Sequence, residues 1–196
     1  MPKKVTNDKL PGLHLKQDSL QELLAATRVL TRSQVLVGVP EETTDDREAG
    51  EPGPPVTNAA LAYIHDNGAP EANIPARPFM IPGIEAVRED VTKVLARAVS
   101  YALSGNAAKV DEGFRRVGTI VSTSVRRKID DGVPPPLADA TVARRAARGR
   151  KGAKQELANR AAGMAPSLDL AKPLIDTGEM RKSITYVVRR RAAGGA

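Results

Sequence analysis

Apolar residues near the N-terminus recur first at helical and then at alternating spacing. The stretch DSLQELLAATRVL predicts an amphipathic helix that begins at Asp18, with this residue as its N-cap. The expected buried face consists of Leu20, Leu23, Leu24, Thr27 and Leu30. The valine-rich stretch QVLVGVP follows and predicts a short strand, which Pro40 ends because proline cannot continue a strand ladder.

Two longer apolar stripes predict an antiparallel pair of helices over residues 83–104 and 107–130. The intervening SGN at 104–106 is short enough for a helical hairpin. The first stripe consists of Ile84, Val87, Val91, Val94, Leu95, Ala98, Tyr101 and Ala102, and the second of Val110, Phe114, Val117, Val121, Val125 and Ile129. The three prolines of DGVPPPLAD then end the second helix.

Shorter elements flank this hairpin. NAALAYIHDNG predicts a helix that is capped by Asn58 and ended by Gly68, with His65 in a local capping role at its end. The connector that follows is expected to be extended and stiff, because proline restricts both itself and the residue before it. Its prolines are Pro75, Pro78 and Pro82.

The C-terminal stretch KPLIDTGEMRKSITYVVRRR predicts a turn followed by a strand. Asp176 is the expected cap of a single helical turn, and SITYVVRR alternates between apolar and polar residues. The apolar face of this strand consists of Ile184, Tyr186 and Val188. Strands near both ends of the chain therefore predict an α+β fold: a small antiparallel sheet packed against the long helical hairpin, with extended arms and loops.

The distribution of apolar and polar residues also predicts where the folded domain and its flanking segments lie. Residues 18–190 are expected to form a single α+β domain, with a flexible N-terminal arm at 1–17 and a flexible tail at 191–196. Residues 41–57 are acidic and rich in glycine and proline, so burial cannot offset their ordering entropy and a mobile loop is expected. Such a loop either becomes ordered on a neighbouring subunit or is a tolerated surface insertion.

Composition argues against catalysis and cofactors. The 196-residue chain has no cysteine, which excludes disulfides and thiolate metal sites, and its only histidines, His14 and His65, are far apart in sequence. No nucleophile elbow or phosphate-binding glycine loop is present. We therefore expect a protein that is not an enzyme and has no cofactor or metal. No secretory signal or long apolar run is present, so synthesis and folding in a cytoplasm are expected.

Charge is unevenly distributed. The net charge is +7, yet residues 1–70 hold 7 basic and 10 acidic residues, whereas residues 71–196 hold 23 and 13. A basic segment at 140–165 fits either a short helix or a solvated loop, and it can bind DNA phosphates without sequence preference. The alternative is a solvated surface that keeps an assembly subunit soluble. The candidate DNA-facing residues are Arg144, Arg145, Arg148, Arg150, Lys151 and Lys154.

Three motifs in order resemble a known family. They are AALAYIHDNG leading to IPARPF, then PPPLADAT, and then KPLIDTGEMRKSI, covering roughly residues 58–188 with gaps. Together they are similar to the tail-completion or virion-morphogenesis proteins of tailed bacteriophages, including Mu-like ones. The positions that carry the resemblance are Ala59, Ala62, Ile64, His65, Gly68, Ile74, Pro75, Arg77, Pro78, Phe79, Pro136, Leu137, Thr141, Lys172, Pro173, Leu174, Asp176, Thr177, Gly178, Arg181, Ser183 and Ile184.

The resemblance implies a structural protein of the virion at the head–tail junction or upper tail, assembled in the host bacterial cytoplasm. It would form a homo-oligomeric ring that binds neighbouring neck, connector or tail-tube proteins, with possible non-specific contact to packaged DNA and no membrane contact. A tail terminator that caps the tail tube is a close alternative, and a small basic DNA-binding accessory protein is an alternative of another class. Candidate partner-binding residues are Arg77, Pro78 and Phe79.

Two departures from the family pattern stand out. Asp66 replaces the more usual glutamate, which is a mild change. The chain also ends soon after Val188, where relatives often continue into further strands. The sheet is therefore expected to be smaller here, or to be completed between subunits.

Overall fold

A computed structural model describes residues 17–40 and 57–191, with side chains from residue 20 onward. The predicted arm, acidic loop and tail lie outside the described residues, apart from Gln17, Thr57 and Arg191 at their bounds. The described elements are α1 (Gln17–Arg32), β1 (Ser33–Gly38), α2 (Asn58–Asn67), the 3-10 turn η1 (Pro70–Ala72), α3 (Met80–Glu85), α4 (Arg88–Leu103), α5 (Ala107–Asp130), α6 (Asp139–Ala147), α7 (Lys151–Ala161), α8 (Glu179–Ser183) and β2 (Thr185–Arg190).

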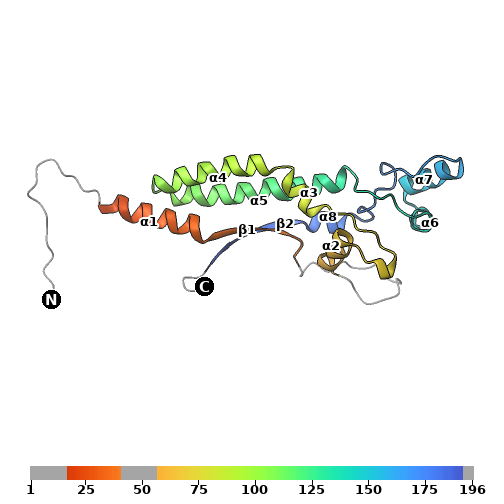
Figure 1. Cartoon of the computed structure of the whole chain (residues 1–196), viewed down its shortest axis with the longest axis horizontal. Helices are drawn as coiled ribbons and strands as arrows, with labels where there is room; N and C mark the ends of the chain where they lie inside the picture. The colour runs from red at the N-terminus through yellow and green to blue at the C-terminus, as the bar shows by residue number, and fades with distance from the viewer. Residues whose placement is uncertain (1–16, 41–56, 192–196) are drawn as a thin grey trace, which may run out of the picture.

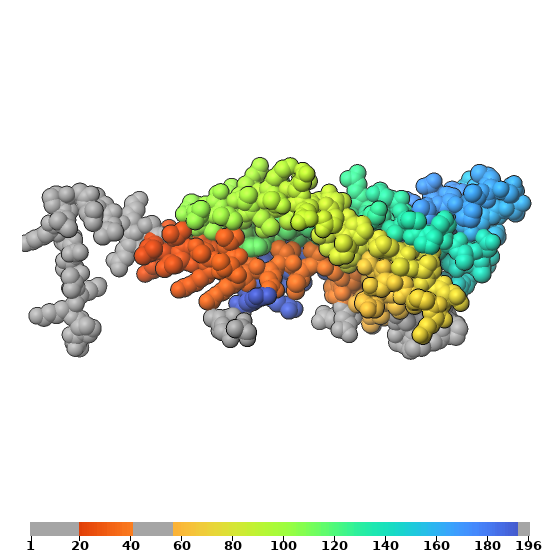
Figure 2. Space-filling model, in the orientation of Figure 1, coloured from red at the N-terminus to blue at the C-terminus, as the bar shows by residue number. Residues whose placement is uncertain are grey.

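The elements form an elongated molecule along the α4–α5 hairpin (Figures 1 and 2). The antiparallel α4–α5 pair and the small antiparallel sheet against α5 are confirmed. Within the described ranges, however, the protein is mostly helical, and its one sheet has only two strands. Helix α1 continues into β1 at one end, and α6 and α7 lie at the other (Figure 1). None of the described helices is long and apolar enough to cross a bilayer.

Helix α5 is the centre of the core. Its predicted stripe is confirmed, because every member of that stripe from Val110 to Ile129 is buried. Asn106 caps the helix, since its Oδ1 accepts from the amide of Lys109 at 3.0 Å. A continuous stripe at helical spacing needs partners along its whole length, and here α1, α3, α4, α8 and both strands supply them.

The predicted helix over 83–104 is divided in two. Helix α3 begins at Met80 and ends at Glu85, and α4 begins at Arg88 after Val87 has left the helical region, with φ −119° and ψ 15°. Pro82 is therefore helical rather than extended. It lies in the first turn of α3, where a missing amide N–H costs no intrahelical hydrogen bond. The break allows both α3 and α4 to pack on α5.

Capping at α2 and α3 also differs from expectation. Thr57 rather than Asn58 caps α2, because its Oγ1 accepts from the amide of Ala60 at 3.1 Å. Gly68 ends the helix at φ 80°, as predicted. The carboxylate of Asp66 caps the start of the next helix, α3, because its Oδ1 accepts from the amides of Phe79 and Met80 at 2.8 and 3.0 Å. The supposedly extended connector also contains the turn η1.

The sheet has one covered face and one open face. In its antiparallel register Val35 opposes Val188 and Val37 opposes Tyr186, and these residues face α5, as the alternation of the C-terminal strand predicted. Leu36 opposes Val187 on the other face, where the two side chains are 42% and 54% exposed. A two-stranded sheet is stable here because α5 covers one of its faces.

Helix α1 has a different buried face from the predicted one. Ala26 is fully buried against the end of the α4–α5 hairpin, and Val29 and Leu30 pack beside it. Leu20 and Leu24 are 60% and 47% exposed and Thr27 is also exposed, so the predicted stripe is wrong at these three positions. The apolar face of α1 is wider than the surface it contacts. The helix also begins at Gln17, so Asp18 lies inside its first turn rather than at the cap.

Candidate functional site

A groove of about 790 Å³ lies between the α2–η1 region and α6. Segments from all three motifs of the family resemblance line it. Its walls are rich in proline, its cationic residues are Arg77, Arg144 and Arg145, and His65 also lines it. None of the described residues that line the groove is acidic. This arrangement makes the groove the strongest candidate for a binding site in the described part of the chain.

Arg77 is a buried positive charge at this groove. Its side chain donates from Nε to the carbonyl of Pro135 at 2.9 Å and from Nη2 to the carbonyl of Pro136 at 3.2 Å. The residue is only 5% exposed, and no carboxylate among the described residues pairs with it. Burial lowers the pKa of its guanidinium. Buried charges are normally paired, yet the residues that the structure describes supply no counter-ion for Arg77.

Arg145 binds the backbone of the third motif. Its Nη1 donates to the carbonyls of Lys172 and Ile175 at 2.8 and 2.7 Å, and its Nη2 donates to Pro173 at 3.1 Å. Its side chain is 13% exposed. Burial lowers the pKa of Arg145, and the nearby Asp176 carboxylate opposes that shift. The side chain of Arg145 thus holds α6 to residues 172–176, and a DNA-facing role for this residue stays a prediction.

Asp176 neutralises part of the basic segment. Its carboxylate lies 3.4 Å from Arg148 and 3.2 Å from Arg150, and 3.8 Å from Nε of Arg145. The sequence predicted that Asp176 caps α8, but this prediction is wrong, because the N-cap position of that helix belongs to Gly178, at φ 86°. These three arginines therefore pair with an aspartate that is distant in sequence, whereas the sequence predicted that their charges face solvent or DNA.

The basic segment forms two short helices, α6 and α7, which decides between the two forms that the sequence allowed. Arg160 is held inside by Glu156 at 2.9 Å and by Asp139 at 2.6 Å. Arg144, Lys151 and Lys154 are exposed, and the described residues provide no ion pair for them. A DNA-facing role for these three stays a prediction.

His65 lies half-buried beside the groove. Its backbone carbonyl accepts from the amide of Arg77 at 2.8 Å, and its ring Nδ1 is buried with no hydrogen-bond partner in the described structure. Burial lowers the pKa of the ring, and the positive charges of Arg77 and Arg145 lower it further. The imidazole is therefore neutral at pH 7, and it is sensitive to any negative charge that enters the groove.

The predicted partner-binding residues divide between interior and surface. Phe79 is completely buried in the main core, and Arg77 is buried as described. Neither side chain is accessible to a partner at the outer surface of this chain, because the fold itself uses both. Pro78 is exposed, and a partner contact there stays a prediction.

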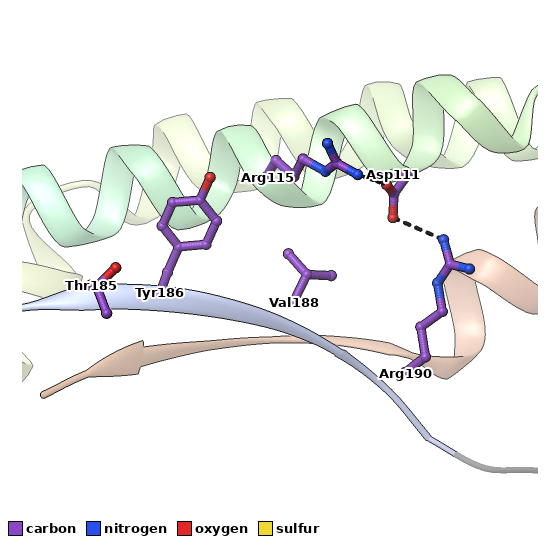
Figure 3. Close-up of a pocket in the computed structure, with 6 residues that line it drawn as sticks. All are labelled: Asp111, Arg115, Thr185, Tyr186, Val188 and Arg190. Atoms are coloured by element: carbon purple, nitrogen blue, oxygen red, sulfur yellow. Dashed lines mark hydrogen bonds and ion pairs between the residues drawn. The ribbon is translucent and has the colours of Figure 1, made fainter. Parts of the chain in front are cut away.

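A second groove, of about 770 Å³, lies between α5 and β2 (Figure 3). Asp111 is its only acidic lining residue among those described, and its carboxylate pairs with Arg115 at 2.7 Å and with Arg190 at 3.1 Å. Tyr186 points from the strand toward the helix (Figure 3). The carboxylate here already has two cationic partners, so this groove is the weaker candidate.

The described residues contain no group of three or more His, Cys, Asp or Glu side chains placed to hold a metal ion. Sequence reasoning missed the α2–α6 groove because it depends on three segments that meet only in the folded chain. The available signal was the combination of arginine and proline in IPARPF and PPPLADAT.

Comparison with known proteins does not assign a family: no family model, curated protein or solved structure matches the chain. The functional argument therefore depends on the residues and the surfaces described above.

Proposed function

We propose that this chain is a tail-completion or head–tail joining subunit of a tailed bacteriophage, which forms a homo-oligomeric ring between the head connector and the tail. One observation carries the proposal: the three motifs that resemble this family bind one another. Arg77 of the first motif donates to Pro135 and Pro136 at the second. Arg145, on the helix that the second motif begins, donates to the third.

The same motifs also share the main core. Ala62 and Phe79 from the first motif and Leu174 from the third belong to one buried cluster. Residues in such positions determine a fold, because removing one exposes apolar surface or leaves buried polar groups without partners. The resemblance therefore lies in residues that specify structure, which supports a shared fold and, through it, a shared role in the virion.

Exposed apolar surface supports assembly with other subunits. Leu36 and Val187 form an adjacent pair on the open face of the sheet, and Leu20 and Leu24 are exposed on α1. In the described part of the chain the sheet has two strands, so each strand has one edge without a partner there. Open edges and apolar patches are features that a monomeric protein normally avoids and that an assembly subunit uses.

Sedimentation velocity and negative-stain electron microscopy of the purified chain test the assembly. We expect ring-shaped oligomers, and we expect Leu36→Lys to shift the chain toward monomer by placing a charge on the open sheet face. Gln155→Lys adds the same charge on an exposed position of α7 and should leave the oligomer intact. A compact monomer that never associates, even with neck or tail proteins, would contradict the proposal.

A DNA-binding accessory protein is the second candidate, and it is favoured by three exposed cations that have no ion pair within the described ranges: Arg144, Lys151 and Lys154. It predicts tight, salt-sensitive binding of duplex DNA by the free protein. Replacing the three residues with Gln should then abolish the binding, as measured by fluorescence anisotropy. If the ring is the main function, the same triple variant assembles normally. The tail-terminator role is a third possibility, close to the first, and tail length distinguishes it.

A further inference from the structure

The α2–α6 groove combines an excess of positive charge with apolar walls. Arg77 has no counter-ion among the described residues, Arg144 is exposed at the groove, and no described lining residue is acidic. A buried guanidinium is expensive to desolvate without an anion nearby. An anion that enters this groove would therefore gain charge-assisted contacts and relieve an existing electrostatic cost.

The walls restrict what that anion is attached to. Prolines 70, 75, 136 and 173 line the groove together with Ile74 and Leu137. Proline fixes its own backbone and has no N–H, so these walls are stiff and offer apolar contact rather than hydrogen-bond donors. A volume of about 790 Å³ lies within the range of sites that enclose a small ligand or a few residues of peptide.

We propose that the α2–α6 groove is a docking site for an extended, acidic peptide segment of another protein, with a carboxylate of the segment paired with the exposed Arg144, near the buried positive charge of Arg77, and its apolar side chains against the proline walls. Duplex DNA fits this site poorly, because binding through phosphates needs several cations on an accessible surface, and Arg144 is the one exposed cation among the described lining residues. The inference depends on the groove alone and stands whether or not the chain belongs to a virion.

Fluorescence anisotropy with the full-length chain tests this proposal. The probe is a fluorescein-labelled octapeptide of alternating glutamate and valine, and the control peptide has Gln in place of Glu. We expect saturable binding of the acidic peptide only. Arg144→Gln should weaken this binding about five-fold, the effect of losing one exposed ion pair. Arg97→Gln removes the same charge from an exposed position on α4, away from α6 in Figure 1, and should leave the affinity unchanged.

A second readout locates the bound peptide. In a His14→Gln background, His65 is the sole imidazole, and its NMR titration reports on the groove. Carboxylates near Arg77 and Arg145 should raise the pKa of His65, because they oppose the two charges that lower it. The proposal is overturned if the acidic peptide does not bind, if Arg97→Gln weakens binding as much as Arg144→Gln, or if the His65 titration is unchanged. Displacement of the peptide by duplex DNA at stoichiometric concentration would also overturn it.

Discussion

Replacing Phe79 with Ala separates a core role from a partner-binding role at this position. Phe79 is completely buried and belongs to the main cluster with Val121 and Val125 of α5. Truncating a buried phenylalanine to alanine typically costs about 3–5 kcal/mol, the sum of lost burial and a residual cavity. For a chain of this size each kcal/mol lowers Tm by about 2–4 °C, so a fall of roughly 6–20 °C is expected.

Urea and thermal unfolding followed by far-ultraviolet circular dichroism measure this effect, at one fixed protein concentration because assembly also stabilises. Ile81→Ala is the matched control: Ile81 lies two residues further along and is 63% exposed, so its truncation should change the free energy of unfolding by no more than about 0.5 kcal/mol. If Phe79→Ala costs less than about 1 kcal/mol, the assignment of Phe79 to the core is refuted.

Two further predictions concern close packing and pH. In Gly83→Ala, the new Cβ would lie 2.7 Å from Cα of Val125, so overpacking of about 1–3 kcal/mol should exceed the gain of about 1 kcal/mol in helix propensity. In Gly38→Ala the new Cβ meets no atom within 4 Å, so this variant should hardly change the free energy of unfolding. Equal destabilisation of the two variants in urea unfolding would contradict the prediction. The hydrogen bond from the amide of Ser167 lowers the pKa of buried Glu156, so this carboxylate stabilises the fold above its unfolded pKa of about 4.3, and the contribution is lost as pH falls further. Glu156→Gln should therefore lower the free energy of unfolding by about 1–3 kcal/mol at pH 7 and by progressively less below about pH 4. A difference between the two proteins that does not change with pH would refute a stabilising role for the Glu156 carboxylate.

The sequence predicted best where one element is buried along its whole length. The stripe of α5 could be read directly, because a helix surrounded by partners needs an apolar residue at every turn of its buried face. On α1 the same rule failed for Leu20 and Leu24, since an apolar residue at helical spacing does not reveal whether a partner lies opposite. The division of the predicted 83–104 helix was also missed, because the apolar stripe continues across the break and both α3 and α4 pack on α5.

The candidate site was harder to predict because its charges are settled by tertiary contacts. In sequence, Arg145, Arg148 and Arg150 are equivalent members of a basic run. In the structure Arg145 binds backbone carbonyls, while Asp176 lies within 4 Å of all three. Local pattern cannot show that an aspartate 26 or more residues away will neutralise them. The sequence shows where positive charges lie, but only the tertiary structure shows which of them remain free to bind a partner.

Electron microscopy of virus lysates tests the central proposal most directly. If the proposed role is correct, a tailed bacteriophage encodes this chain, and an early stop codon in its gene should yield separate, filled heads beside tails, whereas supplying the intact chain in trans should restore joined particles. Tails of irregular length would move the role to tail termination. Normal joined virions produced without the chain would contradict a structural role at the head–tail junction.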